Sequence, residues 1–191
     1  MSAAYEFVTT WRVPGSIGEV KAVLSDAEAL ARWWPSVYLD VVVIDSGAPD
    51  AVGRTVDLHT KGWLPYTLRW RLRITEPVTD AGFALAATGD LEGQGRWTFR
   101  QDGPEVVIVY DWRVSATKPS LRRLSWLLRP AFAANHHWAM ARGEESLQLE
   151  LRRRRVSDAQ AAQEVPGPPA ATFSRLRRLL PFGERARPAP R

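Results

Sequence analysis

The sequence predicts a single α+β domain built from an antiparallel sheet of about seven strands and one long C-terminal helix. Three observations support this prediction. Segments with alternating apolar and polar residues recur through residues 5–114. Two short helix signals follow the first of these segments, and one long helical pattern covers residues 130–154. At 191 residues the chain can hold one domain, assigned to residues 1–155, and a C-terminal tail, assigned to residues 156–191.

The first strand is predicted between Tyr5 and Val13 and ends before a Pro-Gly pair. One side of this strand carries Tyr5, Phe7, Thr9 and Trp11. Ser16 and Glu19 have the spacing of a capping box, which predicts a short helix directly after the strand. Residues 27–34 form a second short helix that Pro35 ends.

Six further strands are expected to form an antiparallel meander, and Gly, Pro and Asp residues separate them. They are predicted at residues 38–45, 54–60, 66–75, 83–88, 95–101 and 106–114. The alternation is clearest in the third of these, where Trp70 and Leu72 oppose Arg71 and Arg73. One face of the sheet should therefore be apolar and the other solvated. Gly93-Gln94-Gly95 is interpreted as a hairpin turn or bulge.

Helical spacing resumes after Pro119, where Leu121, Leu124 and Leu128 share one face. The main helix follows over residues 130–154. At 100° per residue, one narrow face of this helix carries Phe132, His136, Ala139, Gly143 and Leu147. His137 and Trp138 point elsewhere, and His137 is expected at the surface.

The positive charge is concentrated near the C-terminus. The formal net charge is +5. Residues 152–191 contain ten arginines and only three acidic residues, Asp158, Glu164 and Glu184. The rest of the chain is therefore slightly acidic, and no nucleic-acid binding is expected. The Pro/Arg-rich tail is predicted to be disordered. Its arginines are interleaved with apolar residues, which leaves weak contact with a membrane surface open: Phe173, Leu176, Leu179, Leu180 and Phe182.

The composition excludes several classes of site. The chain has no cysteine, so disulfides, thiolate zinc sites and cysteine nucleophiles are ruled out. His136 and His137 diverge by about 100° on a helix, and His59 belongs to a distant strand, so we expect no metal and no cofactor. No N-terminal signal and no apolar run of membrane-spanning length is present, which predicts a soluble, cytoplasmic protein.

The order of strand, two short helices, six strands and long helix resembles the SRPBCC (START-like) superfamily, and within it the polyketide cyclase/dehydrase branch. The motifs that carry the resemblance are Trp33-Trp34-Pro35, the stretch from Gly89 to Gly95 with Trp97, Tyr110-Asp111-Trp112, and the segment from Phe132 through Asn135 and His136 to Met140 and Gly143. The resemblance covers about residues 3–154 and implies a helix-grip fold, in which a curved sheet grips the long helix around a cavity for an apolar molecule. No catalytic set can be transferred with it.

Candidate ligand-binding residues come from the long helix and from aromatic or basic positions on the predicted strands. They are His136, Phe132, Asn135, Arg96, Trp97, Trp70, Trp112, Tyr110 and Met140. His136 could bond a ligand oxygen or transfer a proton, although a buried histidine with a purely structural role fits the same pattern. Arg69 and Arg96 could anchor an anionic group, or they could lie on the solvated face. Trp11, Trp63 and Trp138 are further candidates for an aromatic lining.

The leading hypothesis is a non-enzymatic protein that binds or carries a small hydrophobic molecule, lipidic or polyketide-like, between the sheet and the long helix. A first alternative is an aromatase/cyclase-type enzyme that confines a polyketide and polarises its carbonyl groups. A second alternative is a protein-interaction or regulatory module whose tryptophans fill its own cavity.

Overall fold

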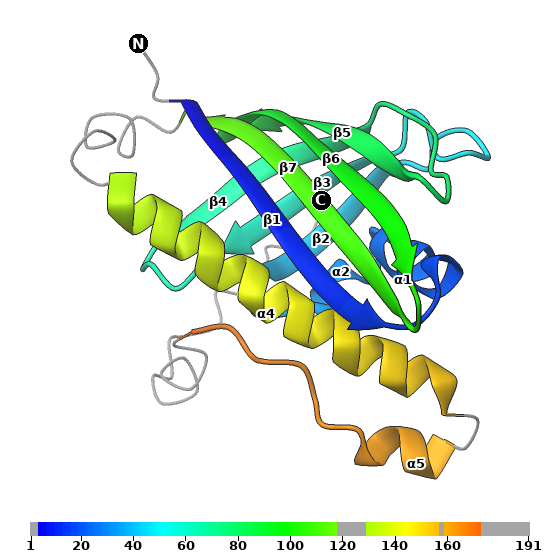
Figure 1. Cartoon of the computed structure of the whole chain (residues 1–191). Helices are drawn as coiled ribbons and strands as arrows, with labels where there is room; N and C mark the ends of the chain where they lie inside the picture. Colours follow the sequence, from blue (N-terminus) through cyan, green and yellow to red (C-terminus); the bar gives the residue numbers. More distant parts are fainter. Residues whose placement is uncertain (1–3, 118–128, 157–158, 173–191) are drawn as a thin grey trace, which may run out of the picture.

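The computed structural model describes residues 4–117, 129–156 and 159–172 and confirms the helix-grip α+β fold (Figure 1). Its elements, in chain order, are β1 (Ala4–Pro14), α1 (Ile17–Leu24), α2 (Leu30–Trp33), β2 (Tyr38–Asp45), β3 (Thr55–Lys61), β4 (Thr67–Ile74), β5 (Gly82–Gly89), β6 (Leu91–Asp102), β7 (Glu105–Ala116), α4 (Arg129–Arg155) and α5 (Ala159–Glu164). The helical pattern predicted around residues 121–128 lies outside the described residues.

The seven strands form one antiparallel sheet in the order β1-β7-β6-β5-β4-β3-β2. Strands β2 to β7 follow one another as the predicted meander, and β1 completes the sheet by pairing with β7 along its whole length, from Ala4 opposite Ser115 to Pro14 opposite Glu105. Figure 1 shows the curved sheet with α4 crossing its open side and with α1 and α2 at one end. The two-residue period of each strand places one set of side chains inside this curve and the other in solvent.

Local signals explain where the short helices begin and end. The predicted capping box is present, because the Ser16 hydroxyl accepts the Glu19 amide while the Glu19 carboxylate accepts the Ser16 amide. The second helix is shorter than predicted, because the Asp26 carboxylate accepts the Ala29 amide and residues 25–29 form turns. No helix of the described residues is long and apolar enough to cross a membrane.

The interpretation of Gly93-Gln94-Gly95 as a hairpin turn or bulge is wrong, because these residues lie inside β6 and pair in continuous register with β5 and β7. The turn into β6 lies earlier, at Gly89 and Asp90. There the Asp90 carboxylate and amide bond the backbone of Arg69 on β4. Gly95 in β6 instead makes room for interior side chains, because a side chain at this position would overlap the Tyr110 and Trp112 rings.

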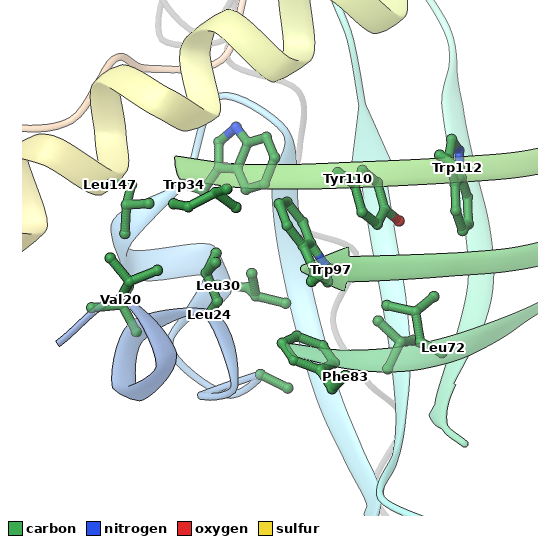
Figure 2. Close-up of a cluster of buried hydrophobic side chains, with 14 of the residues drawn as sticks. Val20, Leu24, Leu30, Trp34, Leu72, Phe83, Trp97, Tyr110, Trp112 and Leu147 are labelled. Carbon is green, nitrogen blue, oxygen red and sulfur yellow. The ribbon is translucent and has the colours of Figure 1, made fainter. Parts of the chain in front are cut away.

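The two halves of α4 contact different parts of the domain. Its C-terminal half is packed tightly, since Leu147 and Leu151 are 0% and 2% exposed and a side chain at Gly143 would overlap the Trp34 indole. Figure 2 shows Leu147 beside Val20 of α1 and near Leu30 of α2. The N-terminal half, from Phe132 to Met140, faces the hollow of the sheet. The C-terminal half of α4 is thus packed against α1 and α2, whereas the N-terminal half contacts β1 and covers the cavity.

A buried carboxylate, Glu150, anchors the packed end of α4. Its side chain is 2% exposed and accepts hydrogen bonds from three guanidinium groups, those of Arg32 on α2 and of Arg153 and Arg154 on α4, at 2.8–3.1 Å. Burial alone would raise the pKa of Glu150, but the hydrogen bonds from Arg32 and Arg154 hold the pKa below its ordinary value. Arg155 likewise binds Glu19 of α1 at 2.7 Å.

Residues 159–172 belong to the tail for which the sequence predicts disorder, and the structure gives them a defined path. After α5 the chain runs back along α4, where Arg153 donates to the Pro166 carbonyl (Figure 1). Thr172 then meets the end of β3. Its hydroxyl donates to the Gly62 carbonyl, and its own carbonyl accepts from Lys61 at 2.7 Å. Pro166 and Thr172 thus contact α4 and the end of β3, while residues 173–191 lie outside the described part, and the domain boundary at residue 155 stays a prediction.

Replacing Glu150 with Gln should lower the free energy of unfolding by about 1–3 kcal/mol, because three arginines lose the buried charge that they share. Glu145→Gln is the matched control on the same helix, since Glu145 is half-exposed and bonds only Arg142 among the described residues; it should cost less than about 0.5 kcal/mol. Urea unfolding measures both values. Equal effects of the two variants would contradict an anchoring role for Glu150.

Candidate functional site

The site is a cavity of about 200 Å³ between the inner face of the sheet and the N-terminal half of α4. Strands β1 to β7 and helices α1, α2 and α4 all contribute to its lining, which is mostly apolar. Lining residues near the start of α4 are only half-buried, among them Tyr66, Phe132 and Asn135. The cavity is therefore partly open at this end and enclosed at the end where α1 and α2 pack.

The sheet wall of the cavity is a row of aromatic rings on β4, β6 and β7. Tyr110 stacks on Trp97, with ring centroids 4.0 Å apart, and on Trp112 at 5.6 Å, while Trp70 lies 5.9 Å from Trp112. Figure 2 shows Tyr110 between Trp97 and Trp112, with its hydroxyl on the side away from Trp97. The missing side chain at Gly95 leaves the space in which the Tyr110 and Trp112 rings lie. The wall offers a flat, polarisable surface.

Two hydrogen bonds fix polar groups of the lining. The Trp70 indole N–H donates to the Thr60 hydroxyl at 3.0 Å, so this buried pair is satisfied inside the wall. The Asn135 side-chain oxygen accepts the Leu64 amide at 3.2 Å, which fastens the β3–β4 loop to α4. Asn135 thus shapes the edge of the cavity.

His136 contributes a neutral imidazole to the roof. Its ring stacks on Phe7 of β1, with centroids 4.0 Å apart, and its Nε2 lies 3.3 Å from the Thr9 hydroxyl. Burial, with a smaller contribution from the charge of the adjacent His137, lowers the pKa of His136 to about 4. At neutral pH the imidazole carries no charge, and it can donate one hydrogen bond and accept another.

Three tyrosines of the lining, Tyr38, Tyr66 and Tyr110, add polar hydroxyl groups to the cavity. Burial raises the pKa values of Tyr38 and Tyr110 above the ordinary range, and burial together with nearby Tyr5 raises that of Tyr66 to about 12. Within the part of the chain that the structure describes, the hydroxyls of Tyr38, Tyr66 and Tyr110 make no hydrogen bond. A buried tyrosine hydroxyl normally has a partner, so these groups can serve a bound molecule.

The structure brings eight of the nine predicted site residues to this one cavity: His136, Phe132, Asn135, Trp97, Trp70, Trp112, Tyr110 and Met140. Arg96 does not line it, because it is the neighbour of Trp97 on β6 and therefore faces outward. There it pairs with Glu76 beside the Asp111–Arg113 ion pair in a polar groove on the outer face. Whether any lining residue contacts a ligand stays a prediction.

Other candidates for an aromatic lining lie elsewhere. Trp11 is 2% exposed and belongs to the core, where it packs on Trp34 and Trp97. Trp63 is 38% exposed on the β3–β4 loop, and Trp138 is half-buried outside the cavity. His137 is exposed, as predicted.

Sequence reasoning missed several lining aromatics: Tyr5, Phe7, Trp34, Tyr38 and Tyr66. The alternation in β1 places Tyr5 and Phe7 on the side of Trp11, so that signal was present. Tyr38 was hidden by a register shift between Tyr38 and Asp40 in β2. Tyr66 directly precedes β4.

The sequence matches no protein-family model and no curated protein. Solved structures do share the fold. The protein TTHA0849 of Thermus thermophilus has a TM-score of 0.63 at 15% identity, over 80% of this chain and 100% of that one. The ZhuI aromatase/cyclase of Streptomyces sp. R1128 has a TM-score of 0.61 at 16% identity, over 81% and 98%. A START superfamily protein of Mycobacterium smegmatis has a TM-score of 0.54 at 15% identity, over 78% and 98%. The chain therefore has the START-like, polyketide-cyclase type of fold.

The neutral state of His136 predicts a specific pH dependence. The unfolded imidazole binds a proton near pH 6.5, whereas the folded one does so only near pH 4. Stability should therefore fall as the pH is lowered through this window. His136→Phe, which can keep the stacking on Phe7, should lose this part of the pH dependence. NMR titration of the His136 ring together with urea unfolding at several pH values measures it. A ring that titrates near pH 6.5 in the folded protein would contradict the assignment.

Proposed function

We propose that the protein binds a small apolar molecule in the cavity between the sheet and α4. The observation that carries this proposal is an open volume of about 200 Å³ lined by stacked aromatic rings and by tyrosine hydroxyls that make no hydrogen bond to the described residues. Protein interiors are normally close-packed, because atoms that line an empty cavity lose van der Waals contacts. The volume also argues against the alternative in which the protein's own tryptophans fill the interior.

Fold relatives support a small-molecule ligand. ZhuI is an aromatase/cyclase, and a norcoclaurine synthase of Thalictrum flavum with a TM-score of 0.53 was solved with dopamine and hydroxybenzaldehyde. At 15–16% identity these relatives share the scaffold, and their reactions do not follow from it. Binding in the hollow of the sheet is the property that the lining of this chain supports most directly.

An aromatase/cyclase-type enzyme is the second candidate, because one cavity holds His136 together with the Tyr38, Tyr66 and Tyr110 hydroxyls. These groups could polarise carbonyl oxygens of a confined chain. A histidine with a pKa of about 4 is a weak base at neutral pH, which favours binding over proton transfer. Mass spectrometry and chromatography of a bound compound before and after incubation separate the two functions, since aromatisation releases water, cyclisation alone changes the retention time, and a carrier changes neither.

Filling the cavity should abolish binding. Ala139 lines the cavity on α4, while Ala141 on the same helix is exposed. With 2-naphthol as a fluorescent probe, Ala139→Trp should weaken binding by at least about tenfold, whereas Ala141→Trp should stay within about twofold of the unchanged protein. Fluorescence titration measures the affinities, and circular dichroism checks that both variants fold.

If both variants bind as the unchanged protein does, the probe occupies another site and the proposal fails. If the unchanged protein does not bind the probe, a panel of neutral one- and two-ring compounds is titrated next. Failure of the whole panel would remove the proposed function.

A further inference from the structure

We propose that the ligand is an uncharged compound of one or two rings whose hydroxyl or carbonyl oxygen is held by Tyr110 and Tyr38 deep in the cavity. This inference rests on the proposed function and names its ligand class. It excludes long acyl chains, large multi-ring polyketides and carboxylic acids, and it is carried by the size, the charge and the unused hydrogen-bonding groups of the cavity.

The size of the cavity sets the first limit. A dry engineered cavity of about 150 Å³ binds benzene, whereas drug-sized ligands occupy sites of about 300–1,000 Å³. The cavity here, at about 200 Å³, lies near the lower of these values. It has room for one ring with substituents or for two fused rings. A long acyl chain would leave most of its length outside.

The charges around the cavity set the second limit. Three residues with basic side chains line it: Arg54, Lys61 and His136. The Arg54 guanidinium donates to the Ser25 and Ser46 carbonyls, and the Lys61 ammonium donates to the Thr172 carbonyl. His136 is neutral at physiological pH. A carboxylate inside the cavity would lose its hydration, and the two cations at the cavity wall already donate to backbone carbonyls, so we expect the site to favour uncharged molecules.

The hydroxyls set the third condition. Tyr110 is 8% exposed and belongs to the stacked sheet wall, and Tyr38 lies against Trp34 with ring centroids 5.2 Å apart. Burial raises the pKa of Tyr110 well above its usual range, and nearby Tyr38 raises it further, so the two phenols share one interior and stay protonated. Their O–H groups lack partners among the described residues, while Thr60 and Trp70 satisfy each other. An oxygen atom on the ligand would accept the hydrogen bond that each of these O–H groups can donate.

The test is a set of affinities for the full chain, measured by tryptophan quenching or by competition with 2-naphthol. The probes are naphthalene, 2-naphthol, 2-naphthoate and 1-dodecanol. We expect 2-naphthol to bind most tightly, naphthalene to bind about three- to tenfold more weakly, as for one lost hydrogen bond, and 2-naphthoate and dodecanol to bind at least about tenfold more weakly. Tyr110→Phe and Tyr38→Phe should each reduce the ratio of the 2-naphthol affinity to the naphthalene affinity by about three- to tenfold.

The outcomes separate this inference from the proposed function. If 2-naphthoate or dodecanol binds as tightly as 2-naphthol, the ligand class is wrong, while binding in the cavity stands. If both tyrosine variants keep the full preference, recognition of oxygen by these hydroxyls is wrong. If neither these probes nor the wider panel of ring compounds binds, the proposed function itself fails. Circular dichroism is the control for folding of both tyrosine variants.

Discussion

The close contact between Gly143 of α4 and the Trp34 indole fixes the geometry on which the rest of the domain depends. Only a residue without a side chain lets the helix approach the ring at this point. Beyond it, Leu147, Leu151 and the arginine-bound Glu150 hold the C-terminal half of α4 against α1 and α2. Because one half is held, the other half can cross the sheet without filling it. The cavity is thus a consequence of where the helix is anchored.

The cavity combines a rigid apolar wall with a few polar groups, and their states are set by burial. Tyr110 lies flat between Trp97 and Trp112 because Gly95 leaves room beneath the rings. The same burial keeps the tyrosines protonated and His136 neutral. A site of this kind selects by shape, ring stacking and single hydrogen bonds, and it disfavours net charge. These properties suit reversible binding better than proton transfer.

Much of this arrangement can be predicted from the sequence, and the predictions that failed did so for physical reasons. Helical spacing places Phe132 and His136 on the inner face of α4, and strand alternation places Trp70, Trp97 and Trp112 inside the sheet. The same alternation should have excluded Arg96, the neighbour of Trp97. Tyr38 was missed because a register shift interrupts the period of β2. Arg153 and Arg154 looked like tail charge, although helical spacing places both beside Glu150, and the pairing of Arg155 with Glu19 needs a long-range contact that the sequence does not show.

Native mass spectrometry of the protein purified from its own source tests the central claim most directly. The account predicts a complex whose added mass is that of one small, uncharged ring compound, released when the protein is denatured and absent from an Ala139→Trp variant prepared in the same way. A fatty acid or another large lipid in the complex would contradict the assigned ligand class. A protein that is always empty, and that also fails to take up neutral ring compounds, would contradict binding in the cavity.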